Sequence, residues 1–222
     1  MRLQDLSPLL ISLEVAAIAL VIVFFSGIIT AWAVSKMKRG KGIMDTVLSL
    51  PLVLPPTVVG FILLVFCGSN GPLGKLFSLF DVKLIFTVKG AVIAAVVCSF
   101  PIMYRTARGA IDQIEGDLID AARVMGLGRA GVLFKVIVPL SWPVLVSGAL
   151  LSFARALGEF GATIMMAGNI PGKTRTMSVA VYTAVQAGDR QLAYTWVLII
   201  LLISFVVLLL MNLLLSKKFR RV

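Results

Sequence analysis

Five long apolar runs limit what this chain can fold into, because each is close to the roughly twenty residues that a helix needs to cross a bilayer. They cover approximately residues 9–34, 47–66, 90–107, 136–157 and 196–215. Backbone polar groups inside lipid must bond within their own segment, so each run is predicted to be a helix. Hydrophobic residues make up 59% of the chain, which excludes an ordinary soluble domain. We expect an all-α polytopic membrane protein with five transmembrane helices, in a single membrane domain over residues 1–222 with a core of about 9–215.

The basic residues are distributed unevenly between the two sides of the expected membrane. The segments that follow the first, third and fifth runs lie on one side and carry thirteen Lys and Arg. The segments on the opposite side carry seven. Loops rich in Lys and Arg face the cytoplasm. The sequence therefore predicts an N-terminus outside, a C-terminus inside and a cytoplasmic segment between the third and fourth runs. These short clusters account for the net charge of +11 without a nucleic-acid-binding face, so no nucleic acid partner is expected.

Residues 115–139, between the third and fourth runs, are predicted to form a short helix, a glycine turn and a second amphipathic piece. An apolar stripe is predicted from the spacing i, i+3, i+4 and i+7 of Leu118, Ala121, Ala122 and Met125. Gly126 is expected to end the helix. Such a stripe fits a helix lying on lipid as well as a helix docked in a groove of another protein, and spacing alone does not separate the two.

Three prolines lie in the first half of the second run, at Pro51, Pro55 and Pro56. Each removes a backbone donor, and each disfavours the helical conformation of the residue before it. The second span is therefore predicted to be a broken or kinked helix. Broken backbone at membrane depth is tolerated where it is buried in protein or lines a cavity, so this span is a candidate wall of a pathway or a packing kink.

The fourth run ends in two charged residues, Arg155 and Glu159, whose spacing of four places them on one face of a helix. Charged residues at membrane depth are costly and usually face the protein interior, which makes the pair a candidate part of a pathway or gate. The alternative is a mutually neutralising pair that only fixes helix packing.

A glycine-rich stretch follows on the predicted outer side and contains Lys173 and Arg175. These cations would attract an anion in transit or contact a docked protein, or they form an ordinary exposed basic loop. Residues 176–187 behind them are moderately apolar but too short to cross the membrane, and a surface helix and a re-entrant helix both remain open.

The chain lacks the residues that would carry catalysis or bind a nucleotide. Gly172, Lys173 and Thr174 end like a phosphate-binding loop, but Ala167 stands where that motif requires its first glycine. There is no His, and the only cysteines, Cys67 and Cys98, lie far apart in apolar runs, so neither a metal site nor a disulfide framework is indicated. We expect a transport subunit rather than an enzyme, with no cofactor bound by this chain.

The loop between the third and fourth runs contains an acidic residue and two alanines, then a glycine, then an aliphatic-x-aliphatic-Pro sequence, formed by Asp120, Ala121, Ala122, Gly126, Val136, Val138 and Pro139. This pattern resembles the EAA loop of the permease subunits of ABC importers. Asp120 replaces the usual Glu, which keeps the charge. LPLVLPPTVVG, FARALGEFGATI and NIPGKTRTM resemble the molybdate permease family of bacterial ABC importers, and the GEFGA segment is also similar to sulfate and thiosulfate permeases.

The resemblance implies the type I ABC importer permease fold, in a homodimer in the bacterial inner membrane. It implies two cytoplasmic ABC ATPase subunits, which hold ATP and Mg²⁺, and a periplasmic or extracellular binding protein that delivers an oxyanion. Asp120, Ala121, Ala122, Gly126 and Pro139 would then belong to the loop that couples the permease to the ATPase. Sulfate, thiosulfate or tungstate remain alternative substrates. A transporter driven by an ion gradient remains an alternative class, although such proteins often pair two discontinuous helices and only one proline-broken span is visible here.

Overall fold

The structure is a computed structural model that describes residues 5–219, so Arg2, Arg220 and Arg221 of the charge count lie outside the described residues. All regular elements of this part are helical. In chain order they are α1 (Ser7–Ser35), α2 (Lys41–Val53), α3 (Pro56–Cys67), α4 (Pro72–Ser78), α5 (Val88–Asp112), α6 (Gly116–Val124), α7 (Arg129–Val132), the π-helix η1 (Leu133–Ile137), α8 (Val138–Leu157), α9 (Gly161–Ala167), α10 (Met177–Gln186) and α11 (Arg190–Phe219).

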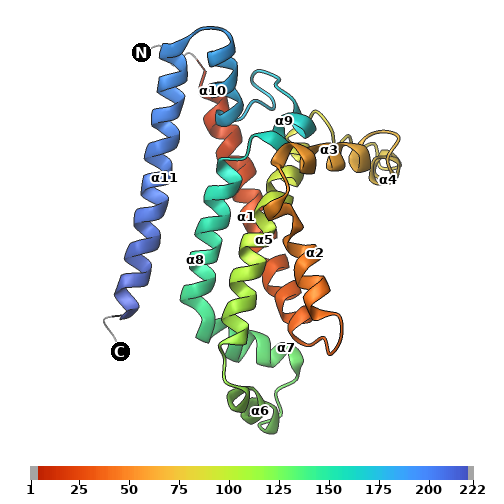
Figure 1. Cartoon of the computed structure of the whole chain (residues 1–222), viewed down its shortest axis with the longest axis vertical. Coiled ribbons are helices and arrows are strands. Elements are labelled where there is room, and N and C mark those ends of the chain that lie inside the picture. Colours follow the sequence, from red (N-terminus) through yellow and green to blue (C-terminus); the bar gives the residue numbers. More distant parts are fainter. Residues whose placement is uncertain (1–4, 220–222) are drawn as a thin grey trace.

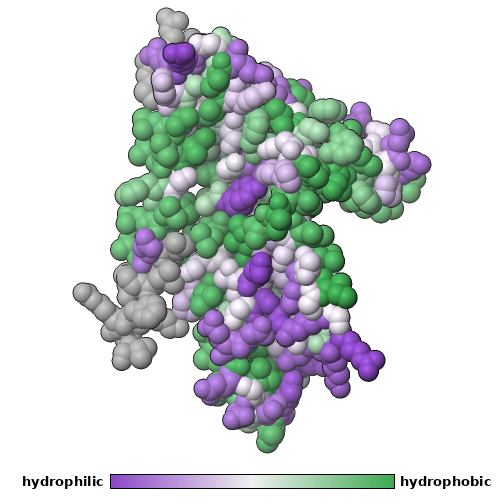
Figure 2. Space-filling model, in the orientation of Figure 1, coloured by the Kyte–Doolittle hydropathy of each residue, from purple (hydrophilic) through white to green (hydrophobic). Residues whose placement is uncertain are grey.

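Long helices run side by side along the molecule, with α6 and α7 at one end and α10 at the other (Figure 1). Within the described residues four helical stretches are long and apolar enough to cross a membrane: α1, α5, the continuous stretch Arg129–Leu157 and α11. Figure 2 shows a hydrophobic middle zone, hydrophilic residues gathered around the α6 end, and a small hydrophilic patch inside the zone. This distribution is that of a chain whose middle faces lipid.

The predicted second span is broken, as its prolines indicated. α2 and α3 meet at a break between Val53 and Pro56 and are bent by 109° relative to each other. The pair makes a fifth span only if both arms are counted as one crossing. Because Pro55 and Pro56 cannot donate backbone hydrogen bonds, the helix cannot continue through this point. In Figure 1, α3 and α4 extend sideways from the bundle while α2 runs back along it.

The core lies where α1, α5 and α8 pack together, and small side chains allow their close approach. Ala16 and Ala19 of α1 and Ala91 and Ala95 of α5 are fully buried in one apolar cluster. In membranes the packing of helices depends on such small residues, because apolar surface gains little by leaving lipid. These alanines therefore set how closely α1 and α5 approach.

Residues 176–187 contain α10 (Met177–Gln186), whose ten residues would span only about 15 Å, half the thickness of a hydrocarbon core. The helix lies beside the start of α11 in Figure 1 and buries Met177, Val179, Ala180 and Ala184. The amide of Met177 donates to the hydroxyl of Ser12 in α1 at 2.8 Å. α10 is thus a short helix fixed to the ends of α1 and α11.

The break between α2 and α3 is held against α9 by glycines. A Cβ atom on Gly60 of α3 would lie 2.7 Å from the Cα of Ala162, and one on Gly161 would lie 3.0 Å from Pro56. Real Cβ atoms essentially never approach another atom within 3.0 Å, so Gly60 leaves no room for a side chain. The backbones of α3 and α9 therefore touch directly.

Replacing Gly60 with Ala is expected to lower stability by about 1–3 kcal/mol, because the added methyl group overpacks a rigid contact. The measurement is the midpoint of thermal unfolding of the purified protein in detergent. Gly109→Ala is the matched control, since a Cβ there meets no atom within 4 Å. An unchanged midpoint for Gly60→Ala would contradict the close approach.

Candidate functional site

The EAA-like segment forms a compact loop at one end of the bundle, beyond the ends of α5 and α8 (Figure 1). α6 ends as expected at a glycine, because Gly126 adopts a left-handed conformation with φ 83°. The amide of Leu127 donates to the carbonyl of Ala122 at 3.1 Å, and that of Gly126 donates to Arg123 at 2.9 Å. This pair of bonds is the Schellman motif, which fixes the direction in which the chain leaves a helix.

The two alanines of the predicted apolar stripe have different environments. Ala122 is 2% exposed and belongs to the apolar cluster that α5 and η1 share. Ala121 is exposed, together with Leu118 and Met125, and Met125 is 75% exposed. Ala122 therefore anchors α6, and the other three residues of the predicted stripe are exposed.

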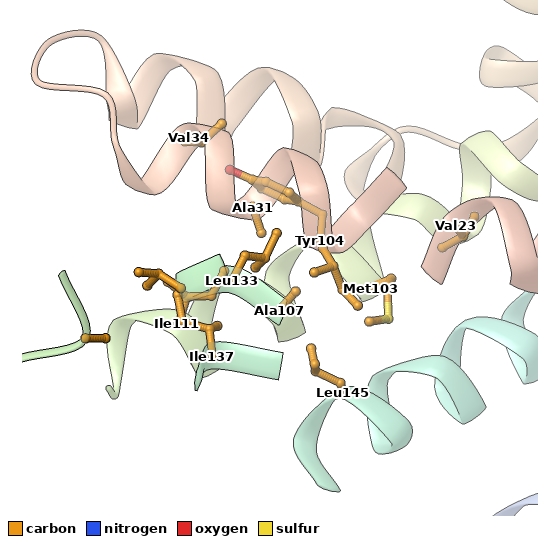
Figure 3. Packing of buried hydrophobic residues seen from close by; sticks show 13 residues of the cluster. Val23, Ala31, Val34, Met103, Tyr104, Ala107, Ile111, Leu133, Ile137 and Leu145 are labelled. Atoms are coloured by element: carbon orange, nitrogen blue, oxygen red, sulfur yellow. The ribbon is translucent and has the colours of Figure 1, made fainter. Parts of the chain in front are cut away.

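The anchor is part of a cluster that joins the loop to the long helices. Figure 3 shows Leu133 and Ile137 of η1 beside Ile111 of α5. Pro139 follows at the second position of α8 and is exposed. Proline lacks the N–H that would continue an α-helical pattern, and the wider π-turn of η1 lies directly before it.

Charged side chains surround the loop. Asp120 and Arg123 form an exposed ion pair at 2.9 Å, which contributes little stability. Lys36, just after α1, lies over the ring of Trp32 at 4.0 Å. Burial and the positive charges of Arg123 and Arg129 lower the pKa of Lys36, while Asp120 opposes them. The end of α1 and the loop thus share one positively charged surface.

Cysteine labelling tests how the two alanines differ. We expect Ala121→Cys to react rapidly with a membrane-impermeant maleimide and Ala122→Cys to react slowly, because only the first faces solvent. The natural thiols Cys67 and Cys98 are buried and supply the background. The labelling rate of each variant is measured in inside-out vesicles, which expose the predicted cytoplasmic side, and compared with its rate in right-side-out vesicles. Equal rates at the two positions would contradict the anchoring of α6.

A second break follows α8, and it corrects the prediction that Arg155 and Glu159 share a helical face. α8 ends at Leu157, so Glu159 lies outside the helix. Its carboxylate accepts a hydrogen bond from Arg155 Nη1 at 2.5 Å and another from the backbone amide of Ala162 at 2.8 Å. Glu159 is 2% exposed, whereas the side chain of Arg155 is 30% exposed. Glu159 both neutralises Arg155 and caps the start of α9.

The two breaks meet in space, since Gly161 of α9 packs against Pro56 at the start of α3. On sequence alone only the proline break was expected. The signals for the second one were Gly158 and Gly161, on either side of Glu159. The structure thus places Pro56 against Gly161, two residues after Glu159, while Pro51 lies within α2 on the other side of the bend.

Arg155→Gln is expected to lower stability by about 2–3 kcal/mol, somewhat less than the loss of a partner from a fully buried pair. The reason is that Glu159 would remain buried with its charge unpaired. The double variant Arg155→Gln with Glu159→Gln should recover most of the loss, because an amide oxygen still accepts from Ala162. Thermal unfolding in detergent measures both. A double variant that is less stable than Arg155→Gln would contradict the pairing.

The basic stretch near α10 is more ordered than an ordinary exposed loop. Arg175 donates through Nε to the side-chain oxygen of Asn169 at 2.7 Å, and the amide of Ile170 donates to the hydroxyl of Thr174 at 3.1 Å. Arg175 therefore braces the loop. For the exposed Lys173 side chain the described residues supply no hydrogen-bond or ion-pair partner, so these two predicted cations differ in role.

One polar cluster was missed by sequence reasoning, which counted its arginine only toward the orientation of the chain. Arg108 of α5 pairs with Asp112 and lies 3.7 Å from Asp45 of α2, while the hydroxyl of Tyr104 donates to Asp45. Lys41 of α2 lies 3.9 Å from Asp112. All of these residues except Lys41 border a cleft of about 490 Å³ between α2 and α5. Within residues 5–219 no group of side chains has the composition of a metal site.

The sequence pattern of the family described as binding-protein-dependent transport system inner membrane component matches residues 13–221. The chain belongs to this family. It is 46% identical over 179 residues to the molybdenum transport system permease protein ModB of Escherichia coli, covering 80% of this chain and 78% of ModB. It is 34% identical over 197 residues to the sulfate transport system permease protein CysT of Salmonella typhimurium, covering 88% of this chain and 71% of CysT.

The fold is also found among solved structures. A chain from the crystal structure of a bacterial ABC transporter involved in the import of the acidic polysaccharide alginate superposes with a TM-score of 0.77. The match covers 98% of this chain and 80% of that chain at 16% sequence identity, so it concerns the fold alone. The predicted all-helical fold of a type I ABC importer permease is confirmed, and so is the predicted resemblance to the molybdate permease group.

Proposed function

We propose that this chain is the membrane-spanning permease subunit of an ATP-driven importer that carries molybdate across the bacterial inner membrane. The choice of substrate rests on one observation: the chain has a higher sequence identity with a molybdenum permease than with a sulfate permease. Family membership favours a transporter that works with a binding protein over one driven by an ion gradient. Tungstate has the same charge and nearly the same size as molybdate, so it is the second candidate substrate.

In this proposal the 115–139 loop is the surface to which the ATPase binds. Its geometry supports that role, because Ala122 fixes α6 to the bundle while Leu118, Ala121 and Met125 remain free to enter a groove on a partner. Asp120 and its partner Arg123 add exposed charge beside this surface. ATP and Mg²⁺ would be bound by two cytoplasmic ATPase subunits and not by this chain.

The translocation pathway is assigned to the two meeting breaks. Interrupted backbone at membrane depth requires protein or a cavity around it, and the breaks at Pro55–Pro56 and Glu159 lie against each other. Arg155, partly exposed beside them, supplies a cation to a passing oxyanion. Two copies of the chain would line the passage, and closure of the ATPases would switch it between two packed states.

We assign the two sides of the membrane from the distribution of the basic residues. The loop with α6 lies in the cytoplasm, the N-terminus outside and the C-terminus inside, as the distribution of basic residues favours. The stretch with Lys173 and Arg175 then faces outward, where an external oxyanion-binding protein docks. The ordered hydrogen bonds of Arg175 support a surface of fixed shape.

The test is a reconstituted complex in proteoliposomes with its ATPase and its binding protein. Molybdate-loaded binding protein is expected to stimulate ATP hydrolysis and to drive molybdate uptake, and sulfate-loaded binding protein is expected to do neither. Arg155→Gln with Glu159→Gln should keep the stimulated hydrolysis and lower uptake. Uptake that depends on a proton gradient without ATP would contradict the proposal, and uptake of tungstate alone would reassign the substrate.

A further inference from the structure

We propose that Arg108 is a positioning residue that transmits movement of the 115–139 loop to α2, the first arm of the broken span. The inference rests on the proposed function, because it requires an ATPase that moves the loop. It assigns a role in coupling to a cluster of side chains that lies outside both breaks and outside the loop itself.

The arm α2 is held loosely by apolar contacts. None of its thirteen residues, all of them described, is buried. Its apolar residues Ile43, Val47 and Val53 are exposed, and a cleft of about 490 Å³ separates it from α5. Within this chain, few apolar contacts therefore hold α2 against its neighbours. Leu48 packs against the apolar cluster of α5, and polar contacts add to this attachment.

Those contacts converge on α5. Tyr104 donates its hydroxyl to Asp45, and Figure 3 shows this hydroxyl pointing away from Leu145 and Ile137 of the apolar cluster. Arg108 is 8% exposed and lies between Asp45 of α2 and Asp112 of its own helix. Lys41 completes the set by approaching Asp112 at 3.9 Å. Two carboxylates, one from each helix, thus share one guanidinium.

The position of this cluster in the chain joins two moving parts. Asp112 is the last residue of α5, and only residues 113–115 separate it from the start of α6. At its far end, α2 leads into the break before Pro56, where the chain bends by 109°. A shift of the loop therefore reaches Asp112 through a short connection, and Arg108 passes it to Asp45 and the arm.

One donor of the cluster has no acceptor among the described residues. Among residues 5–219 no atom accepts a hydrogen bond from the buried Nε of Arg108. Buried donors normally have an acceptor. Asp45 Oδ1 lies 3.7 Å away, and an approach of about 1 Å would complete the bond. Moving α2 toward α5 would therefore complete this bond, so the proposed movement of the arm would change a contact of Arg108.

The experiment measures molybdate imported per ATP hydrolysed in the reconstituted complex. Arg108→Gln and Asp45→Asn are expected to lower this ratio between about twofold and thirtyfold, the span of coupling changes that residues in such networks produce. Arg108→Lys should give an intermediate ratio, because an ammonium keeps the charge but lacks the planar fork that bridges two carboxylates. Arg105→Gln, which removes an exposed arginine on the same helix and the same cleft, should leave the ratio unchanged.

The outcomes separate the inference from the proposed function. A wild-type complex with neither stimulated hydrolysis nor uptake would overturn the proposed function itself. With an active wild type, equal losses of hydrolysis and uptake in Arg108→Gln would mean a merely structural role and would overturn the inference alone. An unchanged ratio of uptake to hydrolysis in Arg108→Gln would also overturn the inference. The same holds if Arg105→Gln lowers this ratio as much as Arg108→Gln does. The amount of assembled complex, measured by size-exclusion chromatography, normalises both activities.

Discussion

The structure depends on how backbone polar groups are bonded where two helices break within the apolar part of the chain. Lipid supplies no hydrogen bonds, so an interrupted helix is stable there only when protein surrounds the break. At the first break Pro55 and Pro56 have no backbone N–H to leave unpaired. At the second, the Glu159 carboxylate accepts the free N–H of Ala162. Glycines of α3 and α9 then let the two breaks pack against each other.

Features set by local sequence could be predicted, because they depend on the periodicity or the conformational limits of neighbouring residues. The long apolar helices follow from run length, and the bend of the second span follows from Pro55 and Pro56. The end of α6 follows from Gly126, which adopts the left-handed conformation that glycine allows without strain. Each of these needs only a few consecutive residues to be specified.

Features set by contacts between distant segments could not be predicted. Tyr104 and Asp45 are 59 positions apart, and nothing in either local pattern indicates that they meet. The burial of Ala122 rather than Ala121 depends on where the ends of α5 and α8 lie, although both residues are alanine. A spacing of four also suggested that Glu159 continues α8, whereas its carboxylate is used by the backbone of the next helix.

The pairing of Arg155 with Glu159 bears on how a passage for an anion would work. An unpaired arginine at membrane depth would be costly and would hold a divalent oxyanion tightly, which would slow its release. Glu159 neutralises most of that attraction. Because it also caps α9, it cannot move away without breaking its hydrogen bond to the backbone amide of Ala162. The side chain of Arg155 remains partly exposed. A weak, fixed cation suits a pathway in which selection is made by a separate binding protein and the permease has only to let the ion through.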